Sequence, residues 1–173
     1  MKRKLLYRAL VLAFVYAGLC LLVAGRQNQM LYFPSKLTEP AALGIAAREG
    51  LEAWRDTAGK IIGWRQLNPR ATARLVVFHG NAGCALDRGY YAAGFGTLEG
   101  GAAWEVYLFE YPGYGTRDGE PGKEAFIAAG RTAVDALLAA DARPLHVLGE
   151  SIGSGIASAL AGTLPDKVAG AVM

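Results

Sequence analysis

The hydrophobic pattern divides the chain into one long apolar segment and a series of short ones. The long segment runs from Ala9 to Gly25 and carries no charge over 17 residues. Three short, largely apolar runs are rich in β-branched and aromatic side chains, and they cover 74–78, 104–109 and 145–148. A short apolar run bounded by turn residues predicts a buried strand.

Helical and hairpin patterns fill the stretches between these runs. An apolar stripe at helical spacing predicts a helix over 123–140, and shorter helices are expected over 41–48 and 86–98. The segments 51–55 and 60–66 predict an antiparallel hairpin. Strands that alternate with helices indicate an α/β fold with a mostly parallel sheet flanked by helices. In such a fold, ligands bind beyond the carboxyl ends of the strands.

Basic residues flank the long apolar segment at its amino end, at Lys2–Lys4 and Arg8. At about 1.5 Å per residue the segment spans roughly 25 Å, near the lower limit for crossing a bilayer. We therefore predict a transmembrane helix within residues 1–26, with the amino terminus in the cytoplasm and the following domain on the outer side. A cleaved signal peptide ending near Val23–Gly25 is the alternative, and it predicts a secreted protein.

Charge and cysteine content exclude several classes of function. The net charge is +3, but residues 1–26 hold five Lys/Arg and no acids, which leaves 13 basic against 15 acidic residues in the rest. This balance provides no basic patch for nucleic acid. The two cysteines form no disulfide framework. Neither zinc-ligand spacing nor a phosphate or dinucleotide motif is present, so we expect no metal and no cofactor.

The strand predicted at 145–148 leads directly into a Gly-Glu-Ser-Ile-Gly sequence at 149–153. A Gly-x-Ser-x-Gly sequence between a strand and a helix is typical of a nucleophile elbow, because the glycines leave room for a sharp turn. A serine hydroxyl becomes a nucleophile when it is held clear of the backbone and given to a base. The sequence therefore predicts Ser151 as a nucleophile; a chance match in a chain with 23 glycines is the alternative.

The strand predicted at 74–78 leads into a second motif, His-Gly-Asn-Ala-Gly at 79–83. Acyl transfer passes through an oxyanion that two backbone N–H groups must stabilise. One donor comes from the residue after the nucleophile, Ile152, and the other from the loop after an earlier strand. Asn81 is our first choice for the loop donor and Ala82 the second. We expect His79 to pin the loop and not to act as an acid or base.

A third motif, Tyr-Pro-Gly-Tyr-Gly at 111–115, follows the predicted strand 104–109. The succession of these three motifs resembles the α/β-hydrolase family, and specifically its membrane-anchored branch of serine aminopeptidase-like enzymes and acyl hydrolases. The resemblance covers residues 30–173. It implies a serine hydrolase of esters, thioesters or amides that forms an acyl-enzyme on Ser151, acts on a small-molecule or acyl/lipid substrate and uses the Asn81 and Ile152 amides as its oxyanion hole.

The triad expected from this family is incomplete in the sequence. Its members run Ser, then Asp or Glu, then His along the chain, yet His79 and His146 both precede Ser151 and only Asp166 follows it. We therefore expect an amino-terminal fragment of a hydrolase, incomplete at its carboxyl end and inactive as written. A non-catalytic remnant or binding module with the same fold is the alternative.

These patterns give a predicted domain organisation. Residues 1–26 are the basic flank and anchor, 27–40 a connector, and 41–173 an incomplete α/β-hydrolase domain. Within the connector, we expect the aromatic and proline-containing segment 31–35 to dock on the domain.

Overall fold

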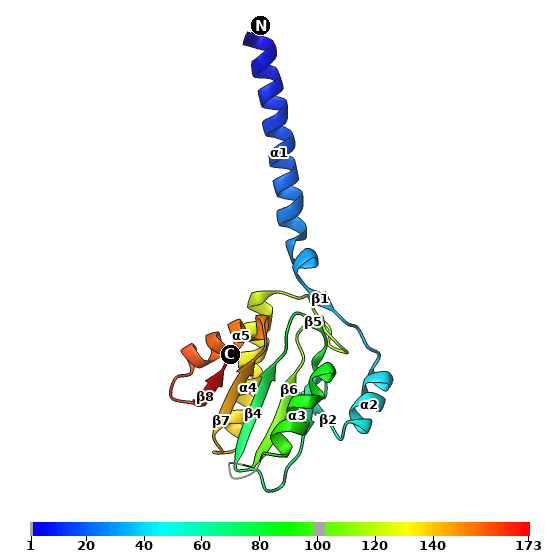
Figure 1. Cartoon of the computed structure of the whole chain (residues 1–173), viewed down its shortest axis with the longest axis vertical. Helices are drawn as coiled ribbons and strands as arrows, with labels where there is room; N and C mark the ends of the chain where they lie inside the picture. The colour runs from blue at the N-terminus through cyan, green and yellow to red at the C-terminus, as the bar shows by residue number, and fades with distance from the viewer. Residues whose placement is uncertain (1, 99–102) are drawn as a thin grey trace. The chain divides into compact units, whose positions relative to one another are not determined.

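The computed structural model describes residues 2–98 and 103–173, and it divides into two compact units, Met1–Tyr32 and Phe33–Met173. The first unit is a single helix, α1 (Lys2–Leu31), with no buried residue (Figure 1). Its mean hydropathy reaches 2.1 over an 18-residue window, so it is long and apolar enough to cross a membrane. A helix that is apolar all round and unburied fits a membrane span better than a surface helix.

Helix α1 continues beyond the predicted anchor and takes up residues 27–31 of the predicted connector. This stretch contains glutamine, methionine and leucine, which are good helix formers, and no proline until Pro34. Proline lacks an N–H and disfavours helical backbone in the residue before it, so the helix ends ahead of Pro34.

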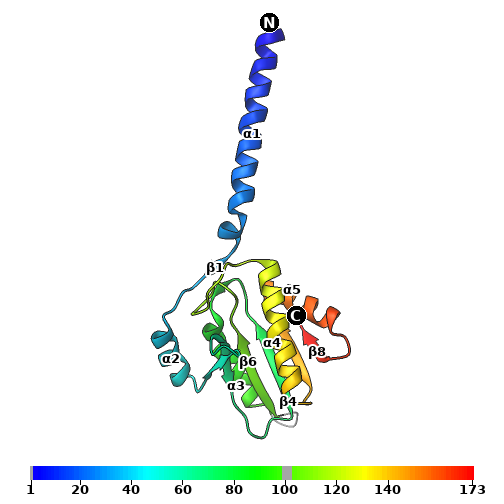
Figure 2. The same cartoon turned by 180° about the vertical axis from the view of Figure 1, so that it is seen from behind.

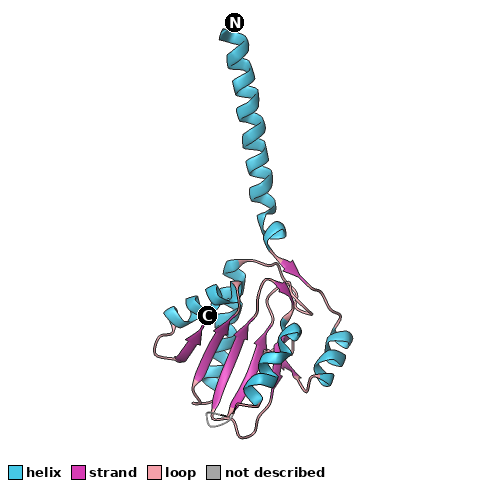
Figure 3. Ribbon diagram, in the orientation of Figure 1, coloured by secondary structure: helices cyan, strands magenta, loops and turns pink. Residues whose placement is uncertain are grey.

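The second unit is built on a six-stranded sheet with the strand order β2-β3-β6-β4-β7-β8. Strands β6, β4, β7 and β8 are parallel, whereas β2 and β3 form an antiparallel hairpin and β3 runs antiparallel to β6 (Figure 3). The strands span Glu52–Arg55 (β2), Ile61–Gln66 (β3), Ala73–Phe78 (β4), Trp104–Phe109 (β6), Leu145–Gly149 (β7) and Val168–Val172 (β8). The predicted α/β fold with a mostly parallel sheet is confirmed.

Helices cover both faces of this sheet, as the views from opposite sides show (Figures 1 and 2). Leu75 and Val77 of β4 share a buried cluster with Ala46 and Ala92, which belong to α2 and α3. On the other face, α4 packs on the ring of Phe78, and α5 packs on β4 and β7. The helices span Glu39–Arg48 (α2), Ala85–Arg88 (the 3₁₀ turn η1), Gly89–Gly96 (α3), Lys123–Ala140 (α4) and Ile152–Thr163 (α5). The helix predicted over 86–98 is thus a 3₁₀ turn followed by a short helix.

Glycine permits the close approach of α4 to the sheet. A Cβ on Gly130 of α4 would lie 3.1 Å from the Phe78 ring and 3.4 Å from Leu160 of α5. All six residues of β4 are buried, as expected for a strand with helices on both faces. This packing fixes the carboxyl ends of β4, β6 and β7, where the three sequence motifs begin.

A second, two-stranded sheet follows the first unit along the chain. Strand β1 (Phe33–Pro34) pairs in parallel with β5 (Ala82–Gly83), which belongs to the loop after β4. The prediction that segment 31–35 docks on the domain is confirmed for Phe33 to Ser35, since the Ser35 amide also donates to the Gly83 carbonyl at 2.9 Å.

Candidate active site

Ser151 lies in a sharp turn between a strand and a helix. β7 ends at Gly149 and α5 begins at Ile152. Ser151 has φ 55° and ψ −117°, and it is the one non-glycine residue with positive φ in the described part of the chain. Such backbone is strained and recurs at functional sites. The side chain is exposed, so the turn presents a hydroxyl to solvent.

Close packing of the backbone explains the two glycines of this turn. A Cβ on Gly153 would overlap the carbonyl oxygen of Phe78, and a Cβ on Gly149 would overlap the backbone of Gly153 and Ser154. The amide of Glu150 donates to the same Phe78 carbonyl at 2.9 Å. The end of β4 and the elbow are therefore in direct backbone contact.

The loop that follows β4 is held by the buried His79, which is 1% exposed. Its Nδ1 lies 2.7 Å from the Gly80 carbonyl oxygen, and its Nε2 lies 3.3 Å from Oε1 of Glu110, outside hydrogen-bonding geometry. Glu110 is buried as well and accepts the Ala85 amide at 3.1 Å. These contacts fit the predicted role of His79 in pinning the loop.

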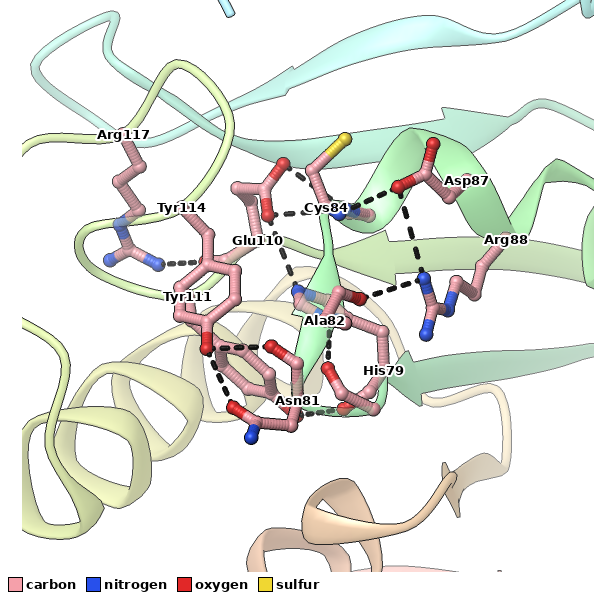
Figure 4. A network of polar contacts seen from close by, with 12 residues as sticks. His79, Asn81, Ala82, Cys84, Asp87, Arg88, Glu110, Tyr111, Tyr114 and Arg117 are labelled. Carbon is pink, nitrogen blue, oxygen red and sulfur yellow. Dashed lines mark hydrogen bonds and ion pairs between the residues drawn. The ribbon is translucent and has the colours of Figure 1, made fainter. Parts of the chain in front are cut away.

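Two tyrosines of the third motif hold the same loop from the other side (Figure 4). The Tyr111 hydroxyl donates to the His79 carbonyl at 2.8 Å, and the Tyr114 hydroxyl donates to the Asn81 carbonyl at 2.8 Å. Burial raises the pKa of Tyr111 well above its ordinary value, so the phenol stays a hydrogen-bond donor. The Tyr-Pro-Gly-Tyr motif therefore shapes the loop that contains Asn81.

Segment 33–37 connects the first motif to the third. The Ser35 amide donates to Gly83 at 2.9 Å, and the Ser35 carbonyl accepts from Gly115 at 2.8 Å. The Leu37 amide donates to the Gly115 carbonyl at 3.0 Å. The chain directly after α1 therefore lies between the loop after β4 and the loop after β6, and it bonds to both through its backbone.

Three other residues could be considered for catalysis: His146, Asp166 and Cys84. His146 lies within β7 and packs edge-on against Trp104, with ring centroids 5.0 Å apart. Asp166 is exposed in the turn before β8. Burial raises the pKa of the Cys84 thiol to about 11, so it is inert at neutral pH. Among the described residues, no hydrogen bond joins Ser151 to either histidine.

Glu150 forms an ion pair directly after the end of β7. Its carboxylate accepts Arg88 Nη2 at 2.8 Å and the Tyr90 hydroxyl at 3.0 Å. The hydrogen bond from Arg88 lowers the pKa of Glu150. Sequence reasoning missed Arg88, because no motif includes it and its contact with Glu150 spans 62 positions.

Residues 73–173 match the model of a protein family described as the alpha/beta hydrolase fold. The chain belongs to the α/β-hydrolase family. An uncharacterised protein of Mycobacterium tuberculosis is 30% identical over 158 residues, a match that covers 87% of this chain and 54% of that protein. The chain thus spans about half the length of the curated relatives it matches.

Solved structures show the same fold. The esterase Pf2001 of Pyrococcus furiosus superposes with a TM-score of 0.57 at 14% identity, over 81% of this chain and 54% of the esterase. A membrane phospholipase A, described as a bacterial virulence factor, superposes with a TM-score of 0.55 at 21% identity, over 99% of this chain and 51% of the phospholipase. These likenesses show that the chain has the α/β-hydrolase fold.

Proposed function

We propose that this protein is a membrane-anchored serine hydrolase that cleaves an ester, thioester or amide through an acyl-enzyme on Ser151. The positive φ of Ser151 between β7 and α5 carries the proposal. A serine needs no such strain to end a strand, whereas a nucleophile gains exposure and alignment from it.

The oxyanion hole of this hydrolase consists of two backbone amides. Ile152 is the first residue of α5, and the amides of a first helical turn have no partner within the helix. The positive end of the helix dipole adds to the stabilisation of an oxyanion there. Asn81 supplies the second amide, with Ala82 as the second choice, because both lie in the loop after β4 whose end contacts the elbow.

The base and acid of the triad come from residues that follow Met173 in the full-length protein. The contacts of His79 and His146 argue against either as the base, since one is buried beside Glu110 and the other packs on Trp104 within β7. The reading frame beyond Met173 is expected to encode an Asp or Glu followed by a His. On the same argument, the 173-residue chain alone has no appreciable ester turnover.

Helix α1 anchors this hydrolase with its amino terminus in the cytoplasm and the catalytic unit on the outer side. The basic residues at 2–4 support this orientation. An anchor keeps the enzyme at a membrane, so an acyl or lipid ester is the substrate class that we favour. The membrane phospholipase A that matches 99% of this chain is a protein of the same fold with a substrate of that kind.

Hydrolysis of a short-chain nitrophenyl ester by the full-length protein tests the proposal. Ser151→Ala is expected to reduce kcat by about 10³-fold or more, because it removes the nucleophile. Ser158→Ala, an exposed serine further along α5, is the matched control and is expected to keep full activity. Turnover that survives Ser151→Ala would overturn the assignment.

A further inference from the structure

One guanidinium group joins the loop after β4 to the nucleophile elbow. Arg88 Nη1 donates to the Ala82 carbonyl at 3.1 Å (Figure 4). Arg88 Nη2 and Nε donate to the two carboxylate oxygens of Glu150 at 2.8 and 3.3 Å. The Arg88 side chain is 14% exposed and that of Glu150 29%, so the pair is largely shielded from water.

The backbone of the loop is fitted around this ion pair. A Cβ on Gly80 would lie 2.8 Å from Glu150 Oε1 and 3.2 Å from Arg88 Nη2. Gly83 has φ +88°, and a Cβ there would lie 2.9 Å from Arg88 Nη1. A side chain at Gly80 would press on the pair itself, whereas one at Gly83 would first overlap Asp87 Oδ2 and then press on Arg88. Gly80 is thus explained by contact with Glu150 and Arg88, and Gly83 by its positive φ and its contact with Asp87 and Arg88.

Neighbouring groups hold both partners in place. Asp87 lies 3.9 Å from Arg88 and accepts the Cys84 amide at 2.8 Å, which fixes the start of the 3₁₀ turn that carries Arg88. The Tyr90 hydroxyl donates to Glu150 Oε2 at 3.0 Å. The arginine therefore acts as a fixed bridge and not as a mobile surface side chain.

The bridge ends next to the two proposed halves of the oxyanion hole. Ala82 directly follows Asn81, and Glu150 directly precedes Ser151. We propose that Arg88 is a positioning residue that sets the distance between the Asn81 amide and the elbow, with Glu150 as its contact on the elbow. This inference rests on the proposed function.

The chemistry of an oxyanion hole makes that spacing matter. Donors must lie about 2.7–3.1 Å from the developing oxyanion, and a misplacement of about 1 Å can reduce the rate about 100-fold. Arginine suits the task because its planar fork reaches a carbonyl and both carboxylate oxygens at once. A lysine ammonium is a single point and cannot make all three contacts.

Steady-state kinetics of the full-length protein test the proposal with Arg88→Met, Arg88→Lys, Glu150→Gln and the Met/Gln double variant. We expect kcat to fall 10- to 100-fold in Arg88→Met and Arg88→Lys, with KM within about twofold of the parent. Because the two residues act through one bridge, the double variant is expected to lose no more than Arg88→Met alone.

Arg131→Met is the matched control. Arg131 forms a similar ion pair with Asp135 at 2.7 Å, but on the solvent side of α4. The variant also loses an arginine–carboxylate pair, and its kcat is expected to match the parent. Titration to completion with a fluorophosphonate counts the folded, competent sites in each sample, so kcat is expressed per active site.

Each outcome decides between the inference and the proposed function. If Ser151→Ala abolishes turnover while both Arg88 variants keep kcat within twofold, the inference is wrong and the proposed function stands. If Ser151→Ala remains active, the proposed function itself is wrong. If Arg88→Met fails to fold, Arg88→Lys and Glu150→Gln carry the test. A higher KM with an unchanged kcat would also overturn the positioning role. So would a double variant whose loss of kcat equals the combined losses of the two single variants.

Discussion

At the scale of single residues, the elbow combines strain with crowding. Ser151 has a positive φ that an L-residue adopts at a cost of about 1–3 kcal/mol. The cost is sustained because the backbone on both sides is pinned, by Glu150 on the Phe78 carbonyl and by Gly153 against the same oxygen. Ser151 is therefore held in place by β4 as much as by its own strand.

Gly153→Ala is expected to be strongly destabilising. The added Cβ would overlap the carbonyl oxygen of Phe78, and neither backbone can move without disturbing β4 or α5. We expect a loss of about 1–3 kcal/mol or more in the free energy of unfolding. Urea denaturation of the purified protein measures this loss.

Gly155→Ala is the control for that substitution. It lies two residues further along α5, where a Cβ would meet nothing within 4 Å. Replacing a helical glycine by alanine there is expected to raise the free energy of unfolding by about 0.5–1 kcal/mol. Equal effects at the two positions would show that the elbow packs less closely on β4 than described.

Sequence patterns identified the residues that belong to local motifs and missed those that do not. Ser151 was predicted because a strand and a helix flank it within a few positions. Arg88 could not be predicted, since its partner Glu150 lies 62 positions away. That contact exists because β4 and β7 are adjacent in the sheet, and adjacency of strands is a property of the tertiary fold.

At the scale of elements, segment 33–37 is the connection that most affects the proposed site. Its backbone forms hydrogen bonds with Gly83, in the loop that contains Asn81, and with Gly115, in the loop after β6. A two-residue strand has no hydrophobic period, which is why the sequence predicted docking of 31–35 but not the pairing of β1 with β5.

Ser35→Pro is expected to weaken this connection. Proline has no N–H, so the 2.9 Å hydrogen bond from Ser35 to Gly83 is lost. The expected loss is about 1 kcal/mol in the free energy of unfolding, together with a lower kcat in the full-length protein. Ser35→Ala keeps the amide and is expected to behave as the parent. A Ser35→Pro variant that matches Ser35→Ala in both measurements would contradict the role given to this segment.

The bounds of the longer helices and strands agree with the segments predicted from the sequence. The helix predicted over 123–140 is α4, and the three predicted runs are β4, β6 and β7. Helix α1 extends five residues past the predicted anchor, because helix-forming residues follow the uncharged segment that ends at Gly25. The segment 86–98 is divided, since η1 ends at Arg88 and α3 covers Gly89–Gly96.

At the scale of the whole molecule, family membership follows from motifs at the ends of three strands, whereas substrate choice depends on side chains that those motifs do not include.

The anchor was predicted from charge and hydropathy alone. Helix α1 agrees with it in length and exposure. The orientation of α1 is tested in the membrane itself, as follows.

The full-length protein is expected to remain in the membrane pellet after carbonate extraction. The physical reason is the burial of the apolar length of α1 in the bilayer. Protease added to intact cells or spheroplasts is expected to cleave the catalytic unit and to spare the amino terminus. A soluble mature protein that begins near Gly25 or Arg26 would show instead that the segment is a cleaved signal peptide.

Covalent labelling is the most direct test of Ser151 as the nucleophile. The full-length protein is treated with a fluorophosphonate and digested, and the modified peptide is sequenced by mass spectrometry. We expect one phosphonylated residue, Ser151, and no labelling of Ser151→Ala. Labelling at Ser154 or Ser158, or labelling that persists in Ser151→Ala, would contradict it.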